Sequence, residues 1–556
     1  MGPDLVFFNG IIHTMDPATP IASAVAIRSC RIVFVGSDEG ARAALGACDG
    51  LPGGSAPELV NLERRCVVPG LTDAHLHFRW YAESLDAVDA ETPTLEQALE
   101  KVAEKARRAE PGSWITGSGW NHNVWAGQTG AGAFPTRQHL DRVASRNPVA
   151  LKAKSGHAMW ANSLALERAG ISAATPDPAG GRIMRERAGD GRAPCGILLE
   201  NALALVQAAI PAPSARELAR AMKRAQAALH RVGLAGIHDY DGVLAFQALQ
   251  EMEASGELTL RVVKGVPREL LDEAIALGLR TGFGGERLSI GALKMFADGA
   301  LGPQTAWMLE PYERARDGGS GIPTLSEDQM IDDIRRANAA GISCAVHAIG
   351  DAACRAVLNA IEKAGFSVSE QAASSIGAPA RGAPRNRLEH AQLLHPDDLP
   401  RLARLGVIAS MQPLHATSDM LIADRHWGAR CAGAYAWRSL LSSGAHLAFG
   451  SDCPVEIPDP LAGIHAAVTR RRADGSPGPD GWRPEQRLTV EQAVRAYTGG
   501  AAYAAGREHE LGRISPGMLA DLTVVDSDVF AIEPHAIRET KVIATVVGGM
   551  FVHRAF

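Results

Sequence analysis

Apolar and polar positions alternate in blocks along the middle of the chain. Each short apolar run is followed by a stretch rich in Ala, Leu, Arg and Glu, which is typical of βα units around a parallel sheet. Eight of these runs are predicted strands: GLTDAH (70–75), AGIHDY (235–240), LRVVKGV (260–266), SIGALKMF (289–296), ISCAVHA (342–348), RLEHAQL (387–393), VIASMQP (407–413) and HLAFGSD (446–452). Eight βα units predict an α/β fold of the (β/α)8 TIM-barrel type, although periodicity alone does not separate it from an open doubly wound sheet.

Residues 76–234 separate the first two predicted strands, whereas a normal βα connection has roughly 2–6 residues. The segment contains strand-like and helix-like pieces of its own: SWITGSGW (113–120), NPVALKAKSGHAMW (147–160), and helical stretches near 95–108 and 214–232. We therefore expect a large insertion after the first strand, at about 90–220, over the barrel mouth. A later stretch rich in Ser, Ala, Gly and Pro, 367–386, predicts a flexible loop.

Both ends of the chain have the pattern of short strands separated by turns. Residues 4–35 are rich in β-branched and aromatic residues, and Gly and Pro interrupt the apolar runs at 512–528 and 542–556. Neither end has enough apolar residues for a core of its own, so we expect the two to pair in one small β-sandwich domain. The predicted boundaries are 1–66 and 506–556 for this domain and 67–505 for the barrel.

Length, charge and cysteine content argue against several classes of protein. A chain of 556 residues is longer than the roughly 100–200 residues of a simple domain. Its net charge of −6, from 56 basic and 62 acidic residues, gives no electrostatic footprint for nucleic acid. No apolar run approaches the roughly 18–20 residues that span a bilayer, and the N-terminus lacks the features of a signal peptide. Eight scattered cysteines without a CxxC pair favour reduced thiols. We expect a cytoplasmic protein with no membrane or nucleic-acid partner.

Polar residues that suit metal binding end five of the predicted strands. They are His75 and His77 at the first strand, Lys294 at the fourth, His347 at the fifth, His390 at the sixth and Asp452 at the eighth. The C-terminal ends of barrel strands meet at one mouth, where active sites are built. Any one of these residues alone would more often be structural. Their common position predicts that all six point into one volume.

The residue types indicate a metal centre. Neutral imidazole nitrogens and a carboxylate suit Zn²⁺ or a similar divalent ion. Lys294 does not fit as an ammonium group, because a cation cannot ligate a cation. It fits if its neutral amine has reacted with carbon dioxide to form a carbamate, which is anionic and able to bridge two metal ions.

The chain resembles the amidohydrolase superfamily, and within it the amidohydrolase-3 branch that includes N-substituted formamide deformylases. The motifs that carry the resemblance are GLTDAHLHF, ALKMFADGALG, AVHAIGD, RLEHAQ and AFGSDCPVE, with GSGWN, SGHAMWANSLAL and PCGILLEN in the insertion and GRISPGMLADLTVVD near the C-terminus. Ser155 departs from the branch, which usually has Asp before the Gly-His of SGHAMW. This change affects a substrate contact rather than the metal site.

The resemblance implies a binuclear centre with two divalent ions, most simply Zn²⁺. His75, His77 and Asp452 would hold the more buried ion and His347 and His390 the other, with carbamylated Lys294 as the bridge. The resemblance also suggests a homodimer.

The expected reaction is hydrolysis of an amide- or formamide-type C–N bond in a small molecule. A bound metal ion supplies a nucleophilic water by lowering the pKa of that water to about 7. Asp452 would accept the proton and pass it to the leaving nitrogen. The sequence contains no GxSxG motif, the motif that would suggest a serine nucleophile instead.

Three residues are candidates for substrate contact. Trp120 and His157 lie in the insertion motifs, and Asp298, with Gly299, follows Lys294. Each also has a structural interpretation, as a packed aromatic ring, a hydrogen-bonded core group or a turn. His238, which ends the second strand, is interpreted as a structural or supporting residue.

Two alternatives remain open. A mononuclear deaminase of a ring C–N bond would usually have Glu three residues after the fifth-strand His, where this chain has Gly350. A non-catalytic, metal-binding regulatory protein would not need the presumed base, Asp452. Metal analysis and turnover of formamides and N-acyl amines would separate these classes.

Overall fold

A computed structural model describes residues 4–46, 57–121, 125, 134–154, 157–186, 193–313, 319–365 and 384–556. Ser155 and most of the loop predicted at 367–386 lie outside these residues. The chain divides into two compact units, one formed by Met1–Tyr81 with Leu218–Phe556 and the other by Ala82–Glu217.

The first unit contains a parallel eight-stranded sheet, which confirms the predicted barrel. Its strand order is β21-β20-β19-β18-β17-β16-β15-β8. The strands are β8 (Leu71–Leu76), β15 (Leu234–Asp239), β16 (Arg261–Pro267), β17 (Leu288–Phe296), β18 (Cys344–Ala348), β19 (Arg387–His390), β20 (Ile408–Met411) and β21 (Leu447–Phe449). Each falls on one of the eight predicted apolar runs. The runs are nearly continuous because parallel strands are buried on both faces.

The segment after β21 returns to β8 and closes the ring. The Asp452 N–H donates to the His75 carbonyl at 2.7 Å, and the His77 N–H donates to the Cys453 carbonyl at 2.8 Å. Gly450 lies at this junction, where a Cβ would come within 2.5 Å of both Asp73 Oδ1 and the His75 backbone nitrogen. The close approach therefore requires glycine.

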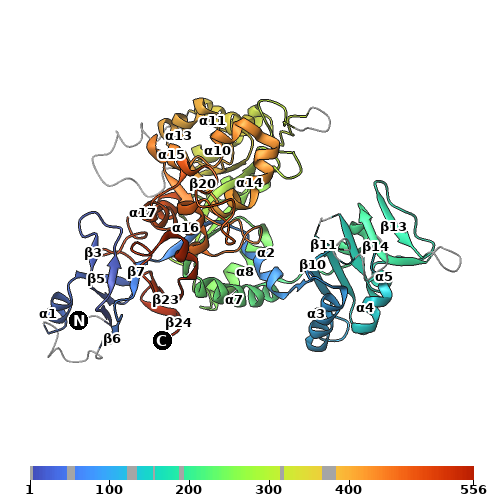
Figure 1. The fold of residues 1–556 in the computed structure, drawn as a ribbon, viewed down its shortest axis with the longest axis horizontal. Helices are drawn as coiled ribbons and strands as arrows, with labels where there is room; N and C mark the ends of the chain where they lie inside the picture. Colours follow the sequence, from blue (N-terminus) through green and yellow to red (C-terminus); the bar gives the residue numbers. More distant parts are fainter. Residues whose placement is uncertain are drawn as a thin grey trace. The chain divides into compact units, whose positions relative to one another are not determined.

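Helices alternate with the barrel strands along the chain, and several of them pack against these strands (Figure 1). They are α7 (Ala215–Arg231), α8 (Val243–Ala254), α9 (Leu271–Ala276), α10 (Glu327–Ala339), α11 (Asp351–Ala364), α13 (Leu399–Leu405), α14 (Pro413–Trp427), α15 (Trp437–Ser442) and α16 (Pro460–Thr469). Several have clear start signals. Ser326 and Gln329 form a capping box at α10, and Pro413 occupies the first turn of α14, where its missing N–H costs nothing.

Strands from both ends of the chain share one sheet. Its order is β24-β23-β22-β7-β2-β3, with β24 (Met550–Arg554), β23 (Val542–Val547), β22 (Leu522–Val525), β7 (Cys66–Pro69), β2 (Ile11–His13) and β3 (Ile21–Ala22). A second sheet has the order β5-β4-β1-β6, with β5 (Arg31–Gly36), β4 (Ala24–Arg28), β1 (Leu5–Phe8) and β6 (Glu58–Asn61). Phe7, Val67 and Val524 belong to one buried cluster. That these sheets form a separate domain with the expected boundaries stays a prediction.

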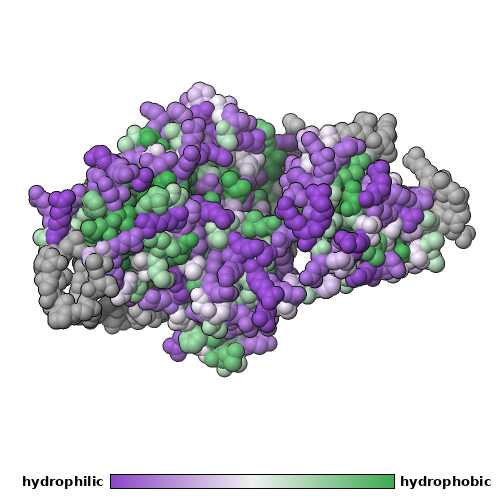
Figure 2. Space-filling model, turned by 90° about the horizontal axis from the view of Figure 1, so that it is seen from below, coloured by the Kyte–Doolittle hydropathy of each residue, from purple (hydrophilic) through white to green (hydrophobic). Residues whose placement is uncertain are grey.

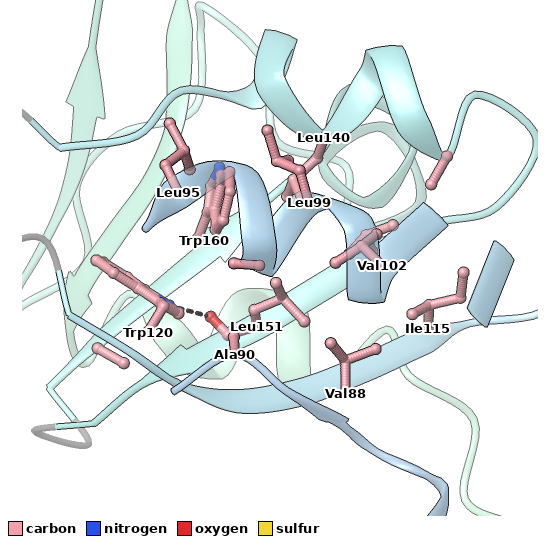
Figure 3. Close-up of a cluster of buried hydrophobic side chains, with 14 of the residues drawn as sticks. Val88, Ala90, Leu95, Leu99, Val102, Ile115, Trp120, Leu140, Leu151 and Trp160 are labelled. Carbon is pink, nitrogen blue, oxygen red and sulfur yellow. Dashed lines mark hydrogen bonds between the residues drawn. The ribbon is translucent and has the colours of Figure 1, made fainter. Parts of the chain in front are cut away.

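The second unit has a mixed six-stranded sheet and its own core. The sheet order is β13-β14-β12-β11-β10-β9, with β13 (Gly181–Arg185), β14 (Pro194–Glu200), β12 (Ala158–Ala161), β11 (Val149–Ala153), β10 (Ile115–Trp120) and β9 (Val88–Asp89). Helices α3 (Leu95–Arg108) and α4 (Arg137–Val143) pack on it through Leu99, Val102 and Leu140 (Figure 3). The placement of this insertion over the barrel mouth stays a prediction.

One face of the molecule is mainly polar. Figure 2 shows hydrophilic residues over most of one face, with apolar residues in scattered groups between them. Within the described part of the chain, no helix is both long enough and apolar enough to cross a membrane.

Candidate metal centre

The barrel brings the predicted ligands to the same end of the sheet. His75 lies in β8 and His77 directly follows it, whereas Lys294, His347 and His390 lie at or near the ends of β17, β18 and β19. Asp452 follows β21. Because successive side chains of an extended chain alternate between faces, the two-residue spacing turns His75 and His77 to the same side.

His75, His77 and Asp452 form the first group of possible ligands. Asp452 Oδ1 lies 3.5 Å from His75 Nε2 and 3.3 Å from His77 Nε2. The ligand atoms of all three residues lie within 4.8 Å of one another. One cation could therefore contact two nitrogens and a carboxylate oxygen.

Three histidine rings are oriented by partners at Nδ1. His75 Nδ1 lies 2.5 Å from Glu389 Oε2, His77 Nδ1 lies 3.2 Å from Asp241 Oδ1, and His390 Nδ1 lies 2.8 Å from Gln412 Oε1. Since these oxygens accept hydrogen bonds, each ring carries a proton on Nδ1, and the neutral form of each ring then has its lone pair on Nε2, where a metal ion would bind. Metal-binding histidines are normally held in this way.

His347 is oriented in the opposite sense. Its Nε2 lies 2.9 Å from the Gly299 carbonyl oxygen, which only accepts, so Nε2 carries the proton and Nδ1 is the nitrogen left for a ligand. Its ring centroid is 4.5 Å from that of His390. The structure thus places these two histidines side by side.

Lys294 lies beside the first group. Its Nζ is 3.2 Å from His75 Nε2, and the side chain is buried. Burial lowers the pKa of Lys294 to about 8, although the charges of Glu389 and Asp452 oppose this shift. A lowered pKa increases the neutral amine that carbamate formation requires. The carbamate itself stays a prediction.

The electrostatics suit a divalent cation. Burial and the charge of Lys294 lower the pKa of His75 to about 4, and burial lowers the pKa of His347 to about 3. Burial opposes ionisation of Asp452, but a hydrogen bond from His77 and the neighbouring histidines hold the pKa of Asp452 well below its usual range. Neutral nitrogens next to an ionised carboxylate are the donors that Zn²⁺ prefers.

The raised pKa of His77 shows that the carboxylates around its ring favour a positive charge there. Burial lowers its pKa, but hydrogen bonds with Asp241 and Asp452 outweigh burial and raise the pKa of His77 to about 9. A metal ion would replace the proton that these carboxylates favour. The residues present therefore fit a divalent metal ion.

A series of buried polar contacts begins at the Nδ1 side of His75. Glu389, which bonds His75, also pairs with Arg387 Nε at 2.7 Å. An Arg387 guanidinium N–H donates to His238 Nδ1 at 2.7 Å. His238 thus contacts Arg387, the residue that is ion-paired with the partner of His75.

A cavity of about 310 Å³ opens beside Lys294. Its walls include Tyr240, Pro267 and Phe296, which lie at the ends of β15, β16 and β17. Space for a small molecule therefore adjoins the ligand cluster.

The structure adds a histidine that the sequence reasoning missed. His390, His415 and Asp452 form a second group with ligand atoms within 4.8 Å of one another. His415 lies in the first turn of α14, directly after the seventh barrel strand, and this position was the available signal. The orienting residues Asp241, Glu389 and Gln412 were also missed, although each lies at or next to a strand end.

The three predicted substrate contacts lie in different surroundings. Trp120 is buried in the core of the second unit and donates from Nε1 to the Leu151 carbonyl at 2.8 Å (Figure 3). The His157 side chain is 70% exposed and its Nδ1 lies 2.9 Å from Glu200 Oε2.

Asp298 is buried near His347. Its carboxylate accepts backbone hydrogen bonds from Trp307, Ile349 and Gly350 at 2.8–3.0 Å. Its carboxylate therefore ties the segment after β17 to the segment after β18. Contact of Trp120, His157 or Asp298 with a substrate stays a prediction.

The chain belongs to the amidohydrolase family, because the model of that family matches residues 58–553. This match confirms the resemblance, and the chain is thus a hydrolase that acts on carbon–nitrogen bonds.

Individual relatives cover nearly the full length. The chain is 32% identical to the putative amidohydrolase YtcJ of Bacillus subtilis over 99% of both chains. It is 30% identical to the N-substituted formamide deformylase of Arthrobacter pascens over 98% of both chains. A solved structure of an uncharacterized metal-dependent hydrolase from Pyrococcus furiosus matches with a TM-score of 0.75 and 29% identity, over 94% of this chain and 99% of that chain.

Proposed function

We propose that the protein is a metal-dependent hydrolase of amide- or formamide-type C–N bonds in small molecules. The observation that carries this proposal is the convergence of Asp452 with His75 and His77 in one cluster beside a cavity. The similarity to an N-substituted formamide deformylase supports the choice of substrate class.

His75, His77 and Asp452 would hold one divalent ion, and His347 and His390 a second, with carbamylated Lys294 between them. Zn²⁺ is our first choice because nitrogen and carboxylate donors dominate the set. Ions bound there would supply a nucleophilic water at neutral pH and polarise the substrate carbonyl.

Asp452 is our candidate for the proton-transferring group. Its Oδ1 faces His75 and His77, and the low pKa of Asp452 keeps this carboxyl group ionised, the form that a proton acceptor must have. The same carboxyl group would then donate that proton to the leaving nitrogen. A positioned acid–base group of this kind contributes about 10²–10⁴ in rate.

The supporting residues would keep this arrangement in place. Hydrogen bonds to Glu389, Asp241 and Gln412 hold three histidine rings in a fixed orientation. These rings are therefore already oriented before a metal ion or substrate binds. The cavity beside Lys294 would take the substituent of the substrate.

The test combines metal analysis with turnover of N-phenylformamide, N-butylformamide and N-acyl amines. We expect bound divalent metal, loss of hydrolysis on chelation and recovery with Zn²⁺. Asp452→Asn should lower kcat by at least about 10²-fold. Asp459→Asn is a matched control, because this residue caps α16 and Asn caps equally well. Full activity of metal-free protein, or of Asp452→Asn, would contradict the proposal.

A further inference from the structure

His415 is a buried histidine at the metal centre that the proposed mechanism does not use. It lies in the first turn of α14, where the chain leaves β20 at the barrel mouth. Its Nε2 is 3.8 Å from Asp452 Oδ2, and its ring stacks on His390 with centroids 6.0 Å apart and planes at 17°. The Nε2 edge of the ring therefore faces Oδ2, the Asp452 oxygen other than the one nearest to His75 and His77.

Gln392 determines which ring nitrogen of His415 carries the proton. The Gln392 amide nitrogen lies 3.3 Å from His415 Nδ1. With the Gln392 amide in this orientation, its NH₂ donates and Nδ1 accepts, so the proton of the neutral ring is on Nε2. The N–H of His415 consequently lies on the ring edge that faces Asp452.

This N–H has no hydrogen-bond partner among the described residues. Buried donors normally have a partner, so an unsatisfied one at a reaction site indicates that a ligand completes it. Asp452 Oδ2, at 3.8 Å, is too distant to accept a hydrogen bond from this N–H.

We propose that His415 is a further catalytic residue, which donates its Nε2–H to the acyl oxygen of the substrate. The proposal rests on the proposed function. His415 itself makes and breaks no covalent bond, and its proton stays on Nε2. The hydrogen bond strengthens as negative charge develops on the oxygen in the transition state, which is how preorganised donors accelerate acyl transfer.

The rival interpretation is that His415 is a metal ligand in the group with His390 and Asp452. Ligation through Nε2 requires the proton on Nδ1, the opposite tautomer. Substitution of Gln392, which contacts Nδ1, should therefore have opposite effects under the two interpretations. Gln392→Glu replaces the donor with an acceptor, which moves the proton to Nδ1 and removes the Nε2–H.

The kinetic test uses Zn²⁺-loaded protein with N-phenylformamide. We expect His415→Ala to lower kcat by about 10²–10³-fold, with little change in KM, because the donor acts in the transition state. Gln392→Glu should lower kcat in the same way, and His415→Gln, which keeps an N–H, should recover part of the loss. His426→Gln, on the same helix and bonded to Gln304, is the control that should keep normal kcat.

Metal content separates the rival interpretations. Our inference expects His415→Ala and Gln392→Glu to retain as many metal ions per chain as the unmodified protein. Loss of metal in His415→Ala, tighter metal binding in Gln392→Glu, or unchanged kcat in both variants would overturn it.

A measurement without turnover keeps this inference separate from the proposed function. ¹⁵N NMR of histidine-labelled protein reports the ring tautomer, with the His415 signals assigned by their loss in His415→Gln. We expect the Nε2–H tautomer, converting to Nδ1–H in Gln392→Glu. An Nδ1–H tautomer in the unmodified protein would overturn the inference even if none of the probes is hydrolysed, whereas that lack of hydrolysis would by itself count against the proposed function alone.

Discussion

Individual side chains at this centre depend on partners that are buried with them. Glu389 contacts His75 and is ion-paired with Arg387, and all three are buried. A buried carboxylate is stable only where such partners compensate for lost hydration. The orientation of His75 is therefore as much a property of Glu389 as of its own strand.

Glu389→Gln should weaken metal binding about 10–100-fold, since loss of an orienting carboxylate typically has this effect. Competition with a chromophoric chelator would measure the change. The control is Glu362→Gln, which alters an exposed pair with Arg401 and Arg404 and should leave metal affinity unchanged. Equal affinity of Glu389→Gln and the unmodified protein would show that the contact does not orient His75.

A second buried histidine makes stability depend on pH. Burial lowers the pKa of His230 from its ordinary value of 6.5 to about 4. Between these two pH values the unfolded chain binds a proton that the folded chain does not, so stability is complete above pH 6.5 and falls as the pH drops toward 4. The total loss is about 3 kcal/mol.

His230→Gln should therefore flatten the pH dependence of stability over this range. Urea unfolding midpoints measured at a series of pH values would check the slope. His395→Gln, at a more exposed histidine, should leave the slope unchanged. A slope for His230→Gln equal to that of the unmodified protein would refute the assignment.

At the scale of elements, the eight barrel strands could be predicted because strands buried on both faces appear as apolar runs. The common position of the candidate ligands at strand ends was predictable too, since strand ends meet at one mouth. Contacts between distant elements were not predictable from the sequence. Glu389 meets His75, 314 positions away along the chain, and no local pattern encodes that pairing. His415 was missed because it lies in a helix turn beyond its strand.

Gly450→Ala tests the junction that closes the barrel. The added Cβ would meet Asp73 Oδ1 and the His75 backbone at 2.5 Å, so the segment carrying Asp452 must shift. We expect a lower melting temperature and fewer bound metal ions per chain. Gly302→Ala is the control, because nothing lies within 4 Å of a Cβ at that position. Unchanged metal content in Gly450→Ala would indicate that the junction tolerates the shift.

At the scale of the whole molecule, the sheet shared by both chain ends is tied to the barrel by a buried ion pair. Arg261 in β16 donates to Asp521 from Nε at 2.5 Å and from a second guanidinium nitrogen at 2.8 Å. Asp521 also accepts the Gly548 N–H at 2.8 Å. The barrel and the terminal strands are thus linked through one carboxylate.

Arg261→Leu should destabilise the protein by about 3–5 kcal/mol, because it leaves Asp521 buried without its cation. Thermal or urea unfolding would measure this. Arg336→Leu makes the same change in an exposed pair with Asp272 and should cost no more than about 1 kcal/mol. Similar losses for the two variants would show that the buried pair has no special importance.

The junction between β8 and the segment after β21 also has a consequence for biosynthesis. A ribosome delivers the two imidazoles of the first strand early and the carboxylate of the eighth strand near the end. A nascent polypeptide therefore exposes nitrogen donors without the anion that completes their cluster. If the proposed ions bind, they should therefore bind late, when the segment after β21 joins β8 and closes the barrel.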